Sequence, residues 1–269
     1  MFMTKTGLIK AIIVLVIYVV LGIFLLDLSF ECYSLGIEFS DSLCVGIIAF
    51  VFGVIFFFWV MGYEGKGKLI NSGNKILRKE LKPAEFLKRY ENAKNLKNLV
   101  INKPSVDVLT FVIAAYTTLN DTEKAFAAID EMIEVAKEKN KVFAKLYKVS
   151  LLFSCGRKEE AEELFNQIQN QKMDAKSEFF ADAILKSDRA VCMGDYKTAK
   201  VYYLKSLERK FPKLDNLGKL SMHYSLGEVY MALGEREKAA EHYGYCAENG
   251  GETAMRNDAI DKIAKILKN

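Results

Sequence analysis

The sequence predicts an all-α protein, in which a two-helix transmembrane hairpin precedes an α-solenoid of about four helix pairs that ends in a capping helix. Three observations lead to this prediction. Two apolar runs, residues 8–28 and 43–61, open the chain, and four related copies of a helix-pair pattern follow within residues 104–269. Only 3 prolines occur in the 269 residues, so few positions interrupt the expected helices.

The two apolar runs have the length and composition of membrane-spanning helices. Each is about 20 residues long, enough to cross a hydrocarbon core of about 30 Å, and neither carries a charge in its central part. The connecting residues 29–42 contain acidic residues but no Lys or Arg, whereas basic residues flank the hairpin on its outer sides. Basic flanks stay in the cytoplasm. We therefore expect an integral membrane protein with both termini cytoplasmic, in a bacterial cell membrane.

Charge divides the chain into the hairpin (1–62), a basic juxtamembrane helical linker (63–103) and the solenoid (104–269). Residues 64–103 contain 11 Lys and Arg against 4 Asp and Glu, whereas residues 104–269 contain 25 against 26. The positive excess is therefore absent from the expected folded domain, which argues against nucleic-acid binding. The linker should be helical with a break near Pro83, and a divergent first repeat is an alternative assignment for it.

The clearest copy of the repeated pattern lies between Met222 and Gly251. Its large and small residues are, in order, Leu226, Gly227, Tyr230, Leu233, Gly234, Ala239 and Tyr243. This spacing resembles the tetratricopeptide repeat, a unit of two antiparallel helices. Small side chains at Gly227 and Ala239 would let the two helices approach closely, and Gly234 would adopt the left-handed conformation that ends the first helix.

Three weaker copies precede this one, so the resemblance covers about 165 of the 269 residues. Their turn positions are Asn120, Gly156 and Gly194. Their second-helix alanines are Ala125, Ala161 and Ala199, which with Ala239 are 36, 38 and 40 residues apart. After the last copy, residues 252–267 should form a capping helix that covers the stacking surface of the last repeat. Its expected packing face consists of Ile260, Ile263, Ala264 and Leu267.

The resemblance also implies a binding surface, because in this family the concave face is lined mainly by the first helices of the units. Carried onto this sequence, that face includes Phe111, Phe143, Tyr147, Asp188, Tyr224 and Glu228, together with Met231. The implied groove is aromatic and mildly acidic, and it suits a protein or peptide partner. The alternative is that several of the aromatic residues pack between helices, as large apolar side chains often do.

A second candidate surface is the basic stretch that follows the hairpin. Its residues are Lys66, Lys68, Lys75, Arg78 and Lys79. Such clusters are attracted to anionic lipid headgroups, by about 1 kcal/mol for each near-surface charge. Membrane-surface contact is therefore expected for this stretch, and enforcing the topology is an alternative role for the same residues.

Nothing in the sequence predicts an enzyme, and we expect no catalytic, cofactor-binding or metal-binding residues. The only histidines, His223 and His242, stand without Cys or carboxylate residues at ligand spacing. The predicted function is a membrane-anchored protein–protein interaction scaffold that presents its groove to the cytoplasm. The alternative is an accessory or assembly factor of a membrane protein complex that acts through the hairpin.

Overall fold

The chain divides into two compact units, Met1–Gly65 and Lys66–Asn269, and nearly all of the described residues belong to the second. The residues that the computed structural model describes are 51, 53, 67–97, 104–208 and 213–268.

The predicted membrane-spanning segments, residues 8–28 and 43–61, lie outside the described residues apart from Val51 and Gly53. Across the part of the chain that the structure does describe, no helix combines the length and the apolar character needed to cross a bilayer. This finding contradicts the predicted localisation as an integral membrane protein, and it gives no support to the predicted membrane anchoring. The alternative function, in which the chain acts through the hairpin, concerns residues that the structure does not describe.

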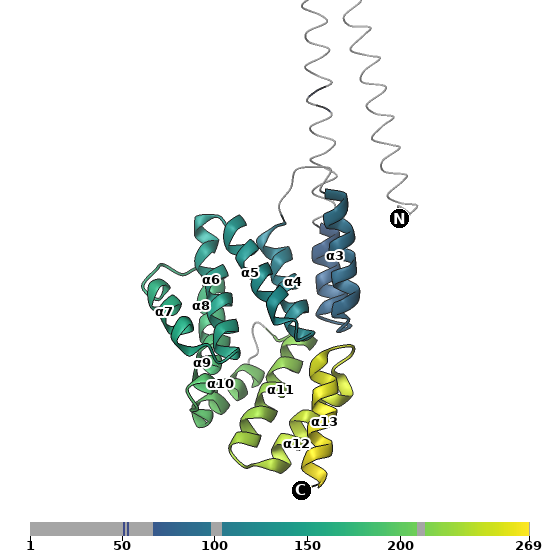
Figure 1. The fold of residues 1–269 in the computed structure, drawn as a ribbon, viewed down its shortest axis with the longest axis vertical. Helices are drawn as coiled ribbons and strands as arrows, with labels where there is room; N and C mark the ends of the chain where they lie inside the picture. The colour runs from purple at the N-terminus through teal and green to yellow at the C-terminus, as the bar shows by residue number, and fades with distance from the viewer. Residues whose placement is uncertain (1–50, 52, 54–66, 98–103, 209–212, 269) are drawn as a thin grey trace, which may run out of the picture. The chain divides into compact units, whose positions relative to one another are not determined.

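Regular structure in the second unit is helical wherever it is described (Figure 1). The elements in chain order, with η for a π-helix, are η1 (Gly73–Leu77), α3 (Pro83–Lys97), α4 (Val106–Thr118), α5 (Thr122–Val135), α6 (Glu138–Ser154), α7 (Lys158–Ile168), α8 (Ala175–Phe180), η2 (Ala181–Leu185), α9 (Lys186–Cys192), α10 (Tyr196–Glu208), α11 (Asn216–Ala232), α12 (Arg236–Asn249) and α13 (Ala254–Lys268). Consecutive helices pack as pairs: α4 with α5, α6 with α7, α9 with α10, and α11 with α12. In the third pair, α8, η2 and α9 follow one another without a break and together form the first helix.

The same turn joins the two helices of every pair. One residue in each turn has a positive φ: Asn120 59°, Gly156 72°, Gly194 75° and Gly234 78°. The amide after each of these residues donates a hydrogen bond of 2.8 or 2.9 Å to the carbonyl five residues earlier. This bond ends a helix through a left-handed residue, a position that favours Gly and tolerates Asn. The predicted turn positions are confirmed at all four sites.

Small residues allow close approach within each pair, as predicted. The second-helix alanines Ala125, Ala161, Ala199 and Ala239 are all 0% exposed. At Gly227 an added Cβ would lie 2.5 Å from the ring of Tyr243, which is itself 0% exposed. The Tyr243 ring therefore lies directly against a helix backbone that has no side chain at the point of contact.

The capping helix α13 is present, but it buries a different face from the one predicted. It packs against α12, and its residues in the core are the fully buried Ala259 and the partly buried Ile263 and Ile266. Ile260 and Leu267 are 43% and 80% exposed. Ile263 belongs to both faces, whereas Ala259 and Ile266 each come one position before a residue of the predicted face. A shift of one position rotates a side chain by about 100° around the helix. Apolar periodicity is compatible with both faces, so it did not separate them.

The turn between η1 and α3, residues 78–82, contacts the last helix pair, and we call it the closing turn (Figure 1). Its carbonyls accept three hydrogen bonds: Arg78 from the Leu217 amide at 3.2 Å, Lys79 from Asn216 Nδ2 at 2.9 Å, and Leu81 from the Glu252 amide at 2.9 Å. Leu81 also packs on the α12–α13 turn, where a Cβ on Gly251 would lie 2.7 Å from its own Cβ. The first and last parts of the described unit are thereby joined directly.

Replacing Gly227 by Leu should destabilise the unit by about 1–3 kcal/mol or more, because the new side chain must displace the Tyr243 ring. Gly244 in α12 is the matched control, since an added Cβ there meets nothing within 4 Å. Gly244→Ala should be neutral or stabilising by up to about 1 kcal/mol, because alanine favours helix. Urea unfolding of both variants measures the difference. Equal effects at the two positions would contradict the close approach at Gly227.

Candidate functional site

The six residues predicted to line a groove all lie on first helices of the pairs. Phe111 is in α4, Phe143 and Tyr147 are in α6, Asp188 is in α9, and Tyr224 and Glu228 are in α11. They fall into two groups: aromatic residues that pack between helices, and polar or tyrosine side chains that form hydrogen bonds.

Most of the predicted groove aromatics belong to the core. Phe111 and Phe143 are only 5% and 4% exposed. Tyr147 stacks on Phe180 of α8, with ring centroids 4.4 Å apart and ring planes at 19°, and Phe143 contacts it edge-on at 5.0 Å. Burial raises the pKa of Tyr147 to about 12. Phe111 and Phe143 therefore do not form an open surface, and Tyr147 does so only in part.

Arg78, one of the basic residues predicted to contact a membrane surface, lies beside the predicted groove residue Phe111. Its guanidinium carbon is 4.6 Å from the centroid of the Phe111 ring, and its Nε is 3.3 Å from a carboxylate oxygen of Asp215 at the start of α11. Phe111 in turn fills the space above Gly73, where an added Cβ would lie 2.5 Å from the ring. Arg78 thus fixes the closing turn to both α4 and α11.

The other basic residues of that set have exposed side chains or are not described. Lys68, Lys75 and Lys79 are exposed, and Lys66 lies outside the described residues. Lys75 is 76% exposed at its side chain, 4.0 Å from Glu80. The positions of these residues do not test the predicted contact with anionic lipid headgroups, which stays a prediction.

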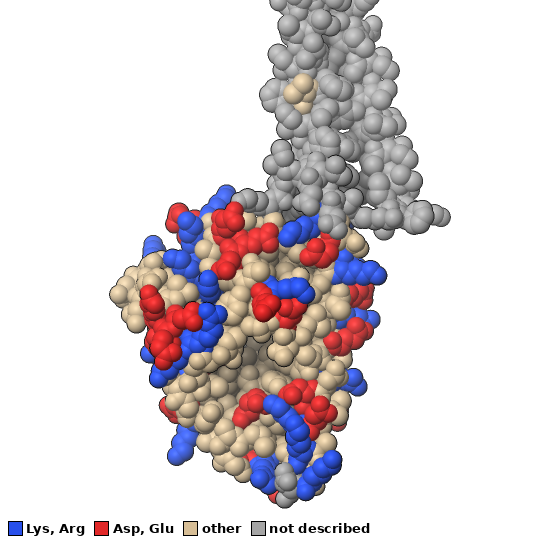
Figure 2. All heavy atoms as spheres, viewed as in Figure 1, with Lys and Arg blue, Asp and Glu red and all other residues tan. Residues whose placement is uncertain are grey.

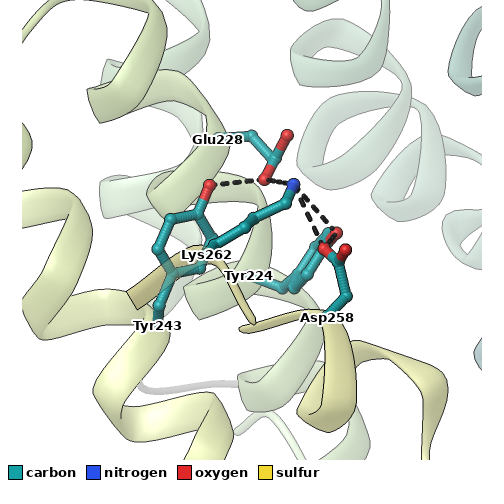
Figure 3. A network of polar contacts seen from close by, with 5 residues as sticks. All are labelled: Tyr224, Glu228, Tyr243, Asp258 and Lys262. Atoms are coloured by element: carbon teal, nitrogen blue, oxygen red, sulfur yellow. Dashed lines mark hydrogen bonds and ion pairs between the residues drawn. The ribbon is translucent and has the colours of Figure 1, made fainter. Parts of the chain in front are cut away.

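A polar network surrounds Lys262, where α11, α12 and α13 meet (Figure 3). Tyr243 donates a hydrogen bond to Glu228, and Tyr224 donates one to Asp258. Lys262 forms ion pairs with both carboxylates, with Asp258 at 3.1 Å. Its Nζ also lies 5.2 and 5.6 Å from the ring centroids of Tyr224 and Tyr243. Two acids and two tyrosine rings therefore enclose one ammonium group.

The surroundings of Lys262 stabilise its charge. Burial alone would lower the pKa of Lys262, but hydrogen bonds to Glu228 and Asp258 and the negative charge of Glu228 outweigh burial and raise it. The lysine therefore stays protonated and fixes α13 to α11. Two residues of the predicted groove, Tyr224 and Glu228, therefore contact side chains of the capping helix α13.

Comparison with protein families matches most of α11 and α12, the helix pair that contributes Tyr224, Glu228 and Tyr243 to this network. Residues 220–248 match the tetratricopeptide repeat family. This segment is therefore similar to a tetratricopeptide repeat. A comparison with curated proteins finds no significant match to the chain. A tetratricopeptide repeat indicates a role in protein–protein interaction, and the three preceding helix pairs share its turn and its buried second-helix alanine.

The preceding pair contains a related tyrosine–carboxylate contact, formed by Tyr203 of α10 and Asp188 of α9. The Tyr203 hydroxyl donates to Asp188 Oδ1 at 3.2 Å, and the Ser150 hydroxyl of α6 donates to Oδ2 at 2.5 Å. Burial raises the pKa of Asp188 to about 6, although both hydrogen bonds oppose the shift. Asp188 forms no ion pair with any side chain that the structure describes.

The π-helix η2 places Asp188 in this position. The amide of Lys186 donates to the carbonyl of Ala181, five residues earlier, so this turn contains one more residue than an α-helical turn. The extra residue changes the register between α8 and α9. Phe180, before the turn, stacks on Tyr147, while Asp188, after it, reaches Ser150 on the same helix α6. π-helical turns are frequent at functional sites.

The two histidines form a packing contact within the tetratricopeptide repeat. Their Nδ1 atoms are 2.9 Å apart, and His223 stacks on Tyr245 while His242 stacks on Tyr230. Burial, together with the charges of His242 and Lys219, lowers the pKa of His223 to about 4. The pair therefore joins α11 to α12 in its neutral form. Over the described ranges, no three or more His, Cys, Asp or Glu residues are grouped as metal ligands would be.

Sequence reasoning missed the partners of the predicted acids. The sequence analysis singled out none of these partners, which are Asp258, Lys262, Ser150 and Tyr203. One signal was available, because both tyrosine–carboxylate pairs, Asp188–Tyr203 and Glu228–Tyr243, are separated by 15 residues. Nothing in the sequence indicated the contact of Arg78 with Phe111, since it depends on the closing turn.

Asp188→Asn should stabilise the protein at about pH 7.5 by about 1–2 kcal/mol, because it removes a buried charge and retains a hydrogen-bonding amide. A pKa of about 6 in the folded state, above the unfolded value of 3.8, means that the native protein holds this proton more tightly. Protonation of Asp188 therefore favours the folded state. This contribution is complete below the unfolded pKa and is lost as the pH rises through about 6, where the buried carboxyl group becomes charged. The advantage of the variant should therefore shrink between about pH 7.5 and about pH 5.

Urea unfolding of both proteins at the two pH values measures this difference. Asp182→Asn is the control, because that carboxylate is 48% exposed and pairs with Lys186. A variant that is less stable than the natural protein by the same amount at both pH values would contradict the assigned burial of a charged Asp188.

Proposed function

We propose that the chain binds a protein partner through the face shared by the first helices α4, α6, α9 and α11. The match of residues 220–248 to the tetratricopeptide repeat carries this proposal. The common turn extends the proposal to the other pairs, because it places each second helix in the same relation to its first helix. Extended stacks of helix pairs commonly bind partners on the face formed by one set of helices.

Figure 2 supports a binding face in this region. It shows a hollow in the middle of the described unit, with uncharged side chains around it and acidic and basic side chains farther out. An uncharged centre with a polar rim is typical of protein–protein interfaces. The proposal is one of binding, and the prediction that the chain is not an enzyme stays a prediction.

Met231 is the most direct probe of this face. It lies in α11 on the same side as Tyr224 and Glu228, at spacings of seven and three residues. Its side chain is 38% exposed, whereas most of the neighbouring aromatic residues are packed. Methionine is a common contact residue at interfaces because it is flexible and polarisable. A change at Met231 should affect binding without disturbing the core.

The test pans a library of short random peptides against the purified full chain and measures the affinity of the selected peptides. Met231→Lys should weaken binding by about tenfold or more, since an interface residue is replaced by a charge. Val201→Lys is the matched control, because Val201 is 60% exposed on the second helix α10. The control should bind as the natural protein does, and both variants should keep their melting temperatures.

Loss of binding in the Val201 variant alone, or unchanged binding in the Met231 variant, would place the binding surface elsewhere on the chain. Failure to select any peptide would contradict the proposal itself.

A further inference from the structure

Two consecutive helix pairs repeat the same local arrangement, in which a carboxylate on the first helix accepts a hydrogen bond from a tyrosine on the second. The pairs are Asp188 with Tyr203 and Glu228 with Tyr243, each 15 residues apart. Both tyrosines are buried, at 3% and 0% exposed. The two arrangements differ in what else reaches the carboxylate.

In the last pair, a cation completes the arrangement. Lys262 forms an ion pair with Glu228, and its Nζ lies 5.6 Å from the centroid of the Tyr243 ring. An ammonium group near a carboxylate and the face of a tyrosine gains from both charge pairing and the cation–π interaction. The chain itself therefore shows which chemical group a tyrosine–carboxylate pair of this kind accepts.

In the preceding pair, no described side chain supplies that cation. Asp188 receives hydrogen bonds only from the hydroxyls of Ser150 and Tyr203. The nearest basic residues along the helix are engaged elsewhere, because Lys186 pairs with Asp182 and Arg189 pairs with Glu162. A partly buried carboxylate without a cation is unfavourable, and a ligand that brings one reduces that cost.

Asp188 belongs to one of the first helices that make up the proposed binding face. It is only partly buried, and it lies on a first helix, as Glu228 does. Its hydrogen bonds to Ser150 of α6 and Tyr203 of α10 fix the carboxylate before any ligand binds, so binding costs little side-chain conformational entropy.

We propose that Asp188 and Tyr203 form a socket for a lysine side chain of the bound protein partner. This inference rests on the proposed function and specifies the chemistry of one contact within it. The lysine of the partner takes the place that Lys262 takes beside Glu228 and Tyr243. The partner segment must therefore present a lysine together with apolar side chains suited to the uncharged centre of the face.

The test uses the peptides selected on the full chain from the random library. Selected peptides should be enriched in lysine, and replacement of that lysine by norleucine, which keeps the length but not the charge, should weaken binding by about tenfold. Asp188→Asn should weaken the lysine peptide by a similar factor and leave the norleucine peptide unchanged. Such a double-mutant cycle isolates the pairwise contact from indirect effects.

Two protein variants serve as controls for this cycle. Asp182→Asn removes an exposed carboxylate six residues away and should change neither affinity. Tyr203→Phe keeps the ring but removes the hydroxyl, so it should weaken the lysine peptide less than Asp188→Asn does.

The outcomes separate this inference from the proposed function. Selected peptides without lysine enrichment, or equal losses for lysine and norleucine peptides with Asp188→Asn, would overturn the socket and leave the binding face standing. Failure to select any peptide would overturn the binding face, and the socket with it.

Discussion

The left-handed turn between the two helices of each pair is the constraint on which the rest of the structure depends. A single residue with positive φ, Gly in three turns and Asn120 in the fourth, ends the first helix and directs the second back along it. The second helix can follow closely because alanine and glycine leave room at the contact, most clearly where the Tyr243 ring lies against Gly227. Repetition of this turn gives every pair the same arrangement of first and second helix, and Asp188 and Glu228 both lie on first helices.

The ends of the described unit add a second constraint, which a simple stack of repeats does not have. The closing turn, residues 78–82, connects to α11 and to the α12–α13 turn, and Arg78 lies between the Phe111 ring and Asp215. At the other end, Lys262 joins the capping helix to Glu228 and Asp258. Both contacts occupy residues near the first-helix face. They leave its middle, around Asp188, as the section where a carboxylate lacks an internal cation among the described residues.

Sequence reasoning succeeded where a local rule determined the outcome. The turn residues and the buried alanines were predictable because backbone conformation and close approach each admit few residue types. It failed where a choice depended on packing between distant segments. The buried face of α13 differs from the predicted one by a single position, Phe111 is covered by a turn that precedes it, and Phe143 packs on Tyr147 within the core. The position of Asp188 depends on the π-helix η2, for which the sequence carries no recognisable signal. The apolar runs that suggested a membrane hairpin lie outside the described residues, and the predicted localisation is corrected.

The most direct test of the central claim, that a partner binds the first-helix face, is photo-crosslinking with a peptide selected on the full chain. The peptide carries a photoreactive group beside its basic residue, and mass spectrometry locates the covalent attachment. The account predicts attachment to residues of α6, α9 or α11. Attachment confined to the second helices α7, α10 and α12 would contradict it.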